Sequence, residues 1–124
     1  MSLFGTSGIR GDAEKFLTDE FCASIGRAFV QFLENHNAHG AIAVGRDPRK
    51  SSPRIEDALF KGLSVSGAQL FDEGICPIPA MCWLQKQPDI AGTIMITGSH
   101  IAPKLNGLKF FALDEEITKE HEAE

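Results

Sequence analysis

The stretch TIMITGSHIAPKLNGLKFF, residues 93–111, changes character twice. An apolar run that ends at Thr97 is typical of a buried strand. Polar residues follow, with Ser99 and His100 side by side, and Lys109 comes ten residues after the serine within a second apolar run. We therefore expect two hydrophobic strands joined by a loop that carries the serine and the histidine, with the lysine on the returning strand.

Outward from this stretch, the chain alternates short apolar strands with amphipathic helices. The first helix is predicted to begin at the N-cap Thr18 and to end near Asn35, and the second to begin with Ser52 as its N-cap and Pro53 in its first position. Strands are expected at 41–44, 68–71, 93–97 and 108–113, and a short helix at 79–87. The buried helix faces are predicted to contain Phe21, Ile25, Ala28, Phe29 and Phe32, and then Ile55, Ala58, Leu59, Gly62 and Leu63. This alternation predicts a three-layer α/β/α sandwich with a mixed, mostly parallel four-stranded sheet.

Length and composition fit one globular domain. The 124 residues are 43% hydrophobic and 23% charged, which is enough for a core without disulfides. No stretch approaches the roughly 20 apolar residues of a membrane span, and the N-terminus lacks the apolar segment of a secretory signal. The three cysteines, Cys22, Cys76 and Cys82, are an odd number that matches no zinc pattern. We expect them to be small buried hydrophobic residues in a reducing cytoplasm.

The net charge of −5 is concentrated at one end of the chain. Residues 114–124 hold six acidic residues and one lysine, so residues 1–113 are neutral. Nucleic-acid binding would require a basic face, and only a short basic cluster at 46–54 is present, so we expect neither a nucleic-acid nor a membrane partner. Residues 1–113 are predicted to form the domain. We expect 114–124 to be a solvated helix start or a linker that leads toward an absent second domain.

The serine-containing loop lies beyond the carboxyl end of a central strand, where open α/β sheets place their ligand sites. Ser99 could be a nucleophile, a helix cap or only a polar loop residue. Gly98 would permit a sharp turn beside the hydroxyl, and His100 and Lys109 could supply charge or move protons. Asn106 and Gly107 predict a turn that folds the lysine back toward the serine. The frame is not the G-x-S-x-G elbow of hydrolases.

Two further stretches could bind an anion. FGTSGIRG, residues 4–11, surrounds Arg10 with glycines, so backbone N–H groups and a guanidinium could converge on a phosphate, although a purely structural turn is the alternative. In VGRDPRKSS, residues 44–52, Arg46 and Arg49 could reach a phosphate. A brace of the turn between Arg46 and Asp47 is the favoured interpretation there.

Together, FGTSGIRG, VGRDPRKSS and TGSH followed by NGLK resemble the first domain of the α-D-phosphohexomutases. That family contains phosphoglucomutase, phosphomannomutase and phosphoglucosamine mutase, and the resemblance runs over essentially all 124 residues. It implies that Ser99 is phosphorylated, donates and accepts the phosphoryl group, and ligates Mg²⁺ through its phosphate. It also implies that Lys109 and Arg10 lie beside that serine.

The resemblance implies a mutase reaction that runs from a hexose 1-phosphate through a bisphosphate to the 6-phosphate, with a sugar 1,6-bisphosphate as activator. Lys109, Arg10 and Mg²⁺ would stabilise the charge of the transferring group, and Lys109 or His100 would handle the proton of the attacking hydroxyl. The TGSH form of the loop leans toward mannose and glucose substrates over glucosamine. The family usually has Asn and Pro after the histidine, where this chain has Ile101 and Ala102. That departure concerns the hydrogen bonding of the loop and not the nucleophile.

Family enzymes have four domains, and the second carries an aspartate-rich metal loop that this sequence lacks. We therefore expect the remaining mutase domains to be partners of this chain, to supply the other Mg²⁺ ligands and to help bind the phosphosugar substrate. The chain alone is expected to fold without turnover and to be capable of self-association. Two alternatives stay open, namely a stand-alone phosphosugar-binding module without turnover and a structural domain whose loop is incidental.

Overall fold

Helices and strands alternate along the chain, as the sequence predicts. The computed structural model describes residues 9–12, 15, 17–36, 40–48, 50–64, 69–75, 78–87, 89–97, 105–112 and 115–116. Their elements in chain order are β1 (Ile9–Asp12), α1 (Asp19–Asn35), β2 (Ala41–Arg46), α2 (Ser52–Leu63), β3 (Leu70–Ile75), α3 (Ile78–Gln85), β4 (Ile90–Ile96), β5 (Leu105–Ala112) and β6 (Glu115–Glu116).

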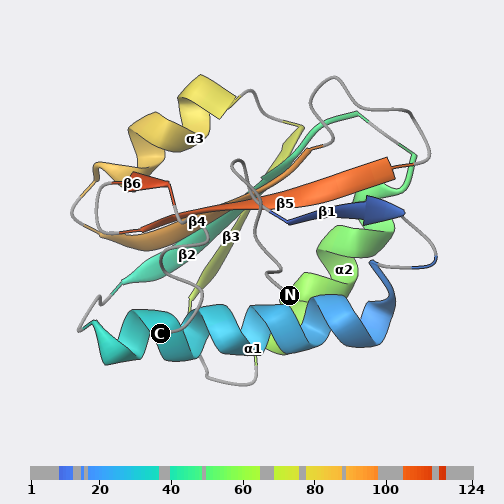
Figure 1. Ribbon diagram of the computed structural model, residues 1–124. Coiled ribbons are helices and arrows are strands. Elements are labelled where there is room, and N and C mark those ends of the chain that lie inside the picture. The colour runs from blue at the N-terminus through green and yellow to red at the C-terminus, as the bar shows by residue number, and fades with distance from the viewer. Residues whose placement is uncertain are drawn as a thin grey trace.

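The strands of the described residues belong to one mixed, 6-stranded sheet with the order β1-β5-β4-β2-β3, and β6 pairs with β5 (Figure 1). Strand β2 is parallel to β3 and β4, as crossover connections through helices require. Strand β5 is antiparallel to β4, β1 and β6. The predicted α/β fold with a mixed sheet is confirmed. The predicted number of four strands was too low because β1 and β6, which are 4 and 2 residues long, are too short to show a strand pattern in the sequence. The sheet is not mostly parallel because β5 is antiparallel to each of its neighbours.

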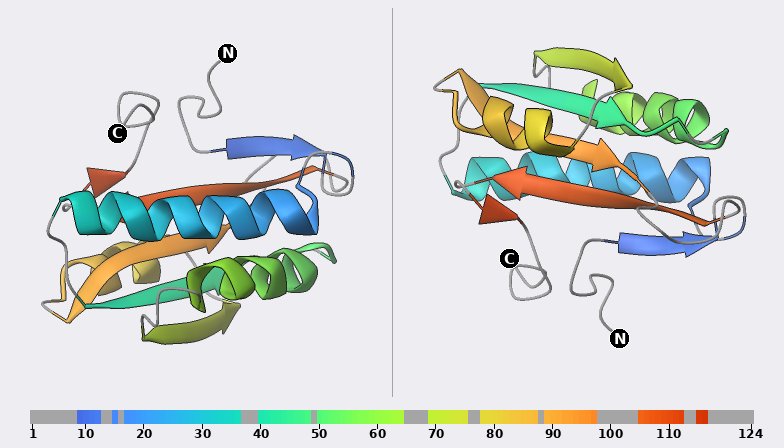
Figure 2. Two further views of the ribbon diagram at one scale, coloured as in Figure 1. Left: turned by 90° about the horizontal axis from the view of Figure 1, so that it is seen from below. Right: turned by 90° about the horizontal axis from the view of Figure 1, so that it is seen from above.

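Helices cover both faces of the sheet, so the predicted three layers are confirmed. Helices α1 and α2 lie together on one face, and α3 lies on the other (Figures 1 and 2). The larger apolar cluster fills the layer under α1 and α2, where the rings of Phe29 and Phe110 have centroids 4.9 Å apart. A smaller cluster lies under α3 and contains Ala43, Met81, Met95 and Phe111.

Helix α1 begins where its capping residue predicts. The N–H of Phe21 donates to Oγ1 of Thr18 at 3.2 Å, and two acidic residues occupy the first turn. Their negative charge interacts favourably with the positive end of the helix dipole. Phe29 of the predicted face is buried, but Ala28 is exposed, because successive helical side chains point about 100° apart. The buried residues of the helix are Cys22, Gly26, Phe29, Val30, Phe32 and Leu33.

Helix α2 packs closely on α1, and the whole buried face predicted for it is confirmed. A Cβ atom at Gly62 would lie 2.0 Å from the carbonyl oxygen of Ala23, so the two helices approach more closely than any larger residue allows. The prediction of Ser52 as the N-cap was wrong. Ser51 occupies the cap position, and Ser52 is the first helical residue, whose hydroxyl donates to Asp47 instead.

The remaining predicted elements are present with shifted ends. The third strand begins and ends later than predicted, and β4 and β5 begin three residues earlier, at Ile90 and Leu105. Glu115 and Glu116 pair with β5 in an extended strand, so the predicted helix start is wrong at these two residues. No helix among the described residues is long and apolar enough to cross a membrane. Cys22 is buried and free, as predicted, whereas Cys76 and the side chain of Cys82 lie outside the described residues.

Candidate functional site

The carboxyl ends of β2 and β4 meet the start of β5 at one edge of the sheet. Because β4 and β5 are antiparallel, the first residues of β5 lie beside the last residues of β4. The N–H of Asp47 donates to the carbonyl of Ile96 at 2.9 Å, and the N–H of Thr97 donates to the carbonyl of Gly107 at 3.0 Å. These hydrogen bonds hold the strand ends together in what is here called the backbone frame. Residues 98–104 connect two of these strands, β4 and β5, in the sequence.

A buried amide, that of Asn106 in β5, links this frame to α2. The side chain of Asn106 is 0% exposed. Its Nδ2 donates to Oγ of Ser51 at 2.8 Å and to Oγ of Ser52 at 3.0 Å, and its Oδ1 accepts from the N–H of Gly107 at 2.8 Å. Both donor hydrogens and the acceptor are therefore used, as a buried amide requires.

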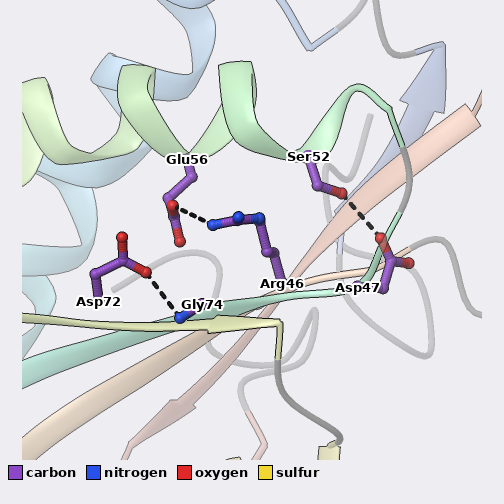
Figure 3. A network of polar contacts seen from close by, with 6 residues as sticks. All are labelled: Arg46, Asp47, Ser52, Glu56, Asp72 and Gly74. Atoms are coloured by element: carbon purple, nitrogen blue, oxygen red, sulfur yellow. Dashed lines mark hydrogen bonds and ion pairs between the residues drawn. The ribbon is translucent and has the colours of Figure 1, made fainter.

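Ser52 continues this linkage to the end of β2. Its hydroxyl donates to Oδ1 of Asp47 at 2.9 Å (Figure 3), and the serine is 0% exposed. The carboxylate of Asp47 thus ties the end of β2 to the first turn of α2. The prediction was a brace between Arg46 and Asp47. In the structure Asp47 bonds to Ser52, and Arg46 bonds to Glu56 of α2.

The turn predicted at Asn106 and Gly107 was wrong, because both residues lie inside β5 and pair with β1. In a turn, an asparagine side chain bonds to its own local backbone. Here it also bonds to two serines more than fifty residues away, and β1 supplies a neighbouring strand. Lys109 is therefore placed by the register of β5 rather than by a hairpin turn.

A second polar cluster joins Arg46 of β2, Glu56 of α2 and Asp72 of β3 (Figure 3). Nη1 of Arg46 donates to Oε1 of Glu56 at 2.8 Å, and the glutamate side chain is 5% exposed. Burial, with a smaller effect from the neighbouring carboxylate of Asp72, raises the pKa of Glu56 to about 7 against the opposing effect of Arg46. This pairing supports a structural role for Arg46. Arg49, the other candidate for phosphate, lies outside the described residues.

The predicted site residues fall partly outside the described part of the chain. Ser99 and His100, the predicted nucleophile and proton carrier, are not among the described residues. The backbone of Arg10 lies in β1 opposite Gly107, and its side chain is not described. Lys109 lies in β5 opposite Met95 and is partly exposed. The sheet therefore brings the backbone of Arg10 beside the strand that carries Lys109.

Lys109 and Asn106 lie on opposite faces of the sheet. Side chains alternate along a strand, and Leu108 and Phe110 belong to the apolar cluster under α1 and α2, whereas Phe111 belongs to the cluster under α3. Lys109 thus shares the α3 face with Phe111. Asn106 points to the other face, where it contacts the start of α2.

Sequence reasoning missed the buried hydrogen bonds of Asn106 and Ser52 and their link to Asp47. The only available signal was the concentration of small polar residues at the end of one predicted strand and the start of another, and it did not identify which of them pair. Among the described residues, no group of three or more His, Cys, Asp or Glu side chains could hold a metal ion. The described residues thus provide no complete ligand set for the expected Mg²⁺.

Comparisons with known proteins point to one family. The family model described as "Phosphoglucomutase/phosphomannomutase, alpha/beta/alpha domain I" matches residues 1–124. The chain is 41% identical over 112 residues to a phosphoglucosamine mutase of Picosynechococcus sp., covering 90% of this chain and 23% of that protein. It is also 41% identical over 108 residues to a phosphoglucomutase/phosphomannomutase of Thermococcus kodakarensis, covering 86% of this chain and 24% of that protein. The chain thus spans about a quarter of the length of these curated relatives.

The fold is shared with a solved member of the same group. A crystal structure of a phosphoglucomutase/phosphomannomutase family protein from Burkholderia thailandensis superposes with a TM-score of 0.86 at 29% identity. The superposition covers 98% of this chain and 29% of that chain. Sequence and fold therefore agree over almost the full length of this chain.

Proposed function

Because the chain belongs to the phosphoglucomutase/phosphomannomutase family, as its alpha/beta/alpha domain I, we propose that it carries the reactive serine, Ser99, of a phosphohexomutase. The observation that carries the proposal is the match to this domain over residues 1–124. The backbone frame supports it. Thr97, two residues before the serine, is bonded to the carbonyl of Gly107 at 3.0 Å, so the chain enters residues 98–104 from a fixed strand end.

In the proposed reaction, phosphorylated Ser99 transfers its phosphoryl group to a hydroxyl of a bound hexose monophosphate. The bond between the sugar oxygen and phosphorus forms as the bond from Oγ of Ser99 breaks. Lys109 or His100 accepts the hydroxyl proton, and Oγ of Ser99 takes up a proton as it leaves. The resulting hexose 1,6-bisphosphate then returns its other phosphoryl group to Ser99 and leaves as the isomeric monophosphate. Positive charge at Lys109 and Arg10 would stabilise the equatorial oxygens of the transferring group.

Mg²⁺, which the family resemblance implies, would neutralise charge on the phosphoryl oxygens when bound. The oxygens of phosphorylated Ser99 are ligands of the kind that Mg²⁺ prefers. The described residues contain no group of three or more side chains that could hold a metal ion. We therefore propose that further ligands come from the remaining mutase domains, which we expect as partners of this chain.

The hexose is proposed to be mannose or glucose, on the strength of the TGSH sequence at residues 97–100. A glucosamine substrate is the second candidate. It is supported by the relative from Picosynechococcus, which is named a phosphoglucosamine mutase and is as similar to this chain as the phosphoglucomutase/phosphomannomutase from Thermococcus. The substrate panel of the test below must therefore include all three sugars.

We expect the 124-residue chain by itself to fold but not to complete the mutase cycle, since the relatives named as mutases are about four times as long. A cytoplasmic location and the absence of nucleic-acid and membrane partners stay predictions. Self-association also stays a prediction, and the side chains of Ile75 and Trp83, which are 66% and 63% exposed, offer apolar surface for it.

The proposal is tested with hexose 1,6-bisphosphate labelled with ³²P. After the chain, joined to the remaining mutase domains, has been labelled in the presence of Mg²⁺ and freed of unbound bisphosphate, unlabelled glucose 6-phosphate, mannose 6-phosphate or glucosamine 6-phosphate is added separately. A phosphohexomutase domain should take up the label and release it to its preferred sugar. Uptake of label without release to any sugar would favour the binding module, and tight sugar binding without uptake would rule out the phosphoryl carrier.

A further inference from the structure

We infer that Asn106 is a positioning residue for phosphoryl transfer at Ser99, an inference that rests on the proposed function. The inference rests on an unbroken series of hydrogen bonds, here called the Asn106 chain. It runs from Asp47 through Ser52, Asn106 and Gly107 to Thr97. Its successive donor–acceptor distances are 2.9, 3.0, 2.8 and 3.0 Å.

The Asn106 chain joins elements that are distant in sequence and holds both strand ends that flank residues 98–104. Thr97 ends one flank, two residues before Ser99, and Asn106 stands at the start of the other. Asp47 and Ser52 fix this pair of flanks to the end of β2 and to the first turn of α2. A shift of Asn106 would therefore also shift Thr97, which lies two residues before Ser99.

The chemistry at this position calls for asparagine. A side chain here must donate to two serine hydroxyls and also accept from the N–H of Gly107, and an amide offers both functions in one plane. Replacing all partners of a buried hydrogen bond by apolar groups is often nearly neutral for stability. A fully satisfied polar network instead fixes one geometry, which is the property that a reactive segment needs.

Asn106 acts through other residues and does not touch the transferring group in this account. Its side chain lies on the α2 face, whereas Lys109, the proposed cationic residue, lies on the α3 face of the same strand. A mutation remote from the chemistry that displaces the reacting groups by about 1 Å can lower the rate about 10²-fold. The expected loss is therefore in the rate of transfer rather than in binding of the bisphosphate.

The test compares five variants of the 124-residue chain with the unchanged chain: Asn106→Leu, Ser52→Ala, their combination, and the two controls Ser24→Ala and Val30→Ala. Ser24→Ala removes the hydroxyl of an exposed serine of α1 that lies outside the Asn106 chain. A second control, Val30→Ala, weakens the core under α1 without touching the Asn106 chain. Two quantities are measured: single-turnover phosphorylation of Ser99 at increasing hexose 1,6-bisphosphate, and hydrogen exchange at the Thr97 amide.

We expect Asn106→Leu to slow phosphorylation about 10²-fold at saturating bisphosphate, with the half-saturating concentration nearly unchanged and the Thr97 amide exchanging faster. Ser52→Ala should slow transfer in the same way, and the combination should be no slower than the slower single variant, because both break one series. Ser24→Ala and Val30→Ala should stay close to the unchanged chain in rate.

Three results would overturn the inference: an unchanged rate in Asn106→Leu, an equal loss in Val30→Ala, or fully additive losses in the combined variant. Failure of the proposed function would look different, because the unchanged chain would then carry no phosphate on Ser99. In that event hydrogen exchange decides the role of the asparagine. Unchanged exchange at Thr97 in Asn106→Leu would show that Asn106 does not hold this strand end.

Discussion

Glu56 and Arg46 are 2.8 Å apart, Oε1 to Nη1, yet the pKa of Glu56 is raised to about 7. A guanidinium alone would lower the pKa of a neighbouring carboxyl group. Burial of the glutamate, together with the carboxylate of Asp72, outweighs that effect. Oε2 of Glu56 is also buried and finds no hydrogen-bond partner. Near neutral pH, Glu56 is therefore divided between its charged and its neutral form.

This pKa predicts how stability changes with pH. Because the pKa of Glu56 rises from 4.5 to about 7 on folding, the folded chain holds this proton more tightly than the unfolded chain does. The stabilisation is complete below pH 4.5 and is lost as the pH rises through about 7. Glu56→Gln cannot titrate, so its free energy of unfolding should lack this part of the decline.

The measurement is urea unfolding of both proteins at a series of pH values across this window. Glu34→Gln, which changes an exposed glutamate of α1, serves as the control and should keep the slope of the unchanged chain. Parallel pH profiles for Glu56→Gln and the unchanged chain would contradict the assignment.

Lys109 should matter for transfer and not for folding. If its charge stabilises the transferring phosphoryl group, Lys109→Ala should slow phosphorylation of Ser99 by roughly 10²- to 10³-fold. The melting temperature should change little, because the lysine is partly exposed. Lys61→Ala, on the exposed side of α2, is the matched control. An effect limited to the half-saturating bisphosphate concentration would mean that Lys109 only binds the ligand.

The contact between α1 and α2 predicts a graded pair of glycine substitutions. Gly62→Ala would place a Cβ 2.0 Å from the carbonyl oxygen of Ala23, whereas Gly26→Ala would place one 3.0 Å from the carbonyl oxygen of Leu59. Overpacking typically costs about 1–3 kcal/mol, so Gly62→Ala should lose more unfolding free energy than Gly26→Ala. Urea unfolding of both variants measures this, and the reverse order would contradict the closer helix contact at Gly62.

The thiol of Cys22 should be unreactive in the folded chain. It is buried, and burial raises its pKa to about 11, so little thiolate is present at neutral pH. In a variant with Cys76→Ser and Cys82→Ser, modification by a thiol reagent should require unfolding, and its rate should rise sharply in urea. Rapid modification without denaturant would contradict the observed burial.

The helices were predictable because their signals are local. Thr18 is followed by acidic residues, and the apolar face of α2 repeats at helical spacing, so the cap of α1 and the buried face of α2 are confirmed. Strands β1 and β6 were not predictable, since 4 and 2 residues are too few to show a period. Their pairing depends on β5, which lies far from β1 in the sequence.

The polar contacts at the strand ends were not predictable for a similar reason. Asn106 beside Gly107 has the sequence of a turn, and only the contact with serines more than fifty residues away fixes it within a strand. The partners of Arg46 were likewise uncertain, because Glu56 approaches it through the packing of α2. The motifs predict which residues form the candidate site, and that assignment stays a prediction, whereas its supporting contacts required the three-dimensional structure.

The most direct test of the account is to locate the phosphate. The chain is incubated with glucose 1,6-bisphosphate or mannose 1,6-bisphosphate in the presence of Mg²⁺, and its intact mass and phosphopeptides are then measured. Ser99→Ala and Ser51→Ala are treated in parallel. The account predicts one added phosphoryl group on Ser99, absent in Ser99→Ala and retained in Ser51→Ala. A phosphoryl group on another residue with Ser99 unmodified, or no phosphorylation at all, would contradict it.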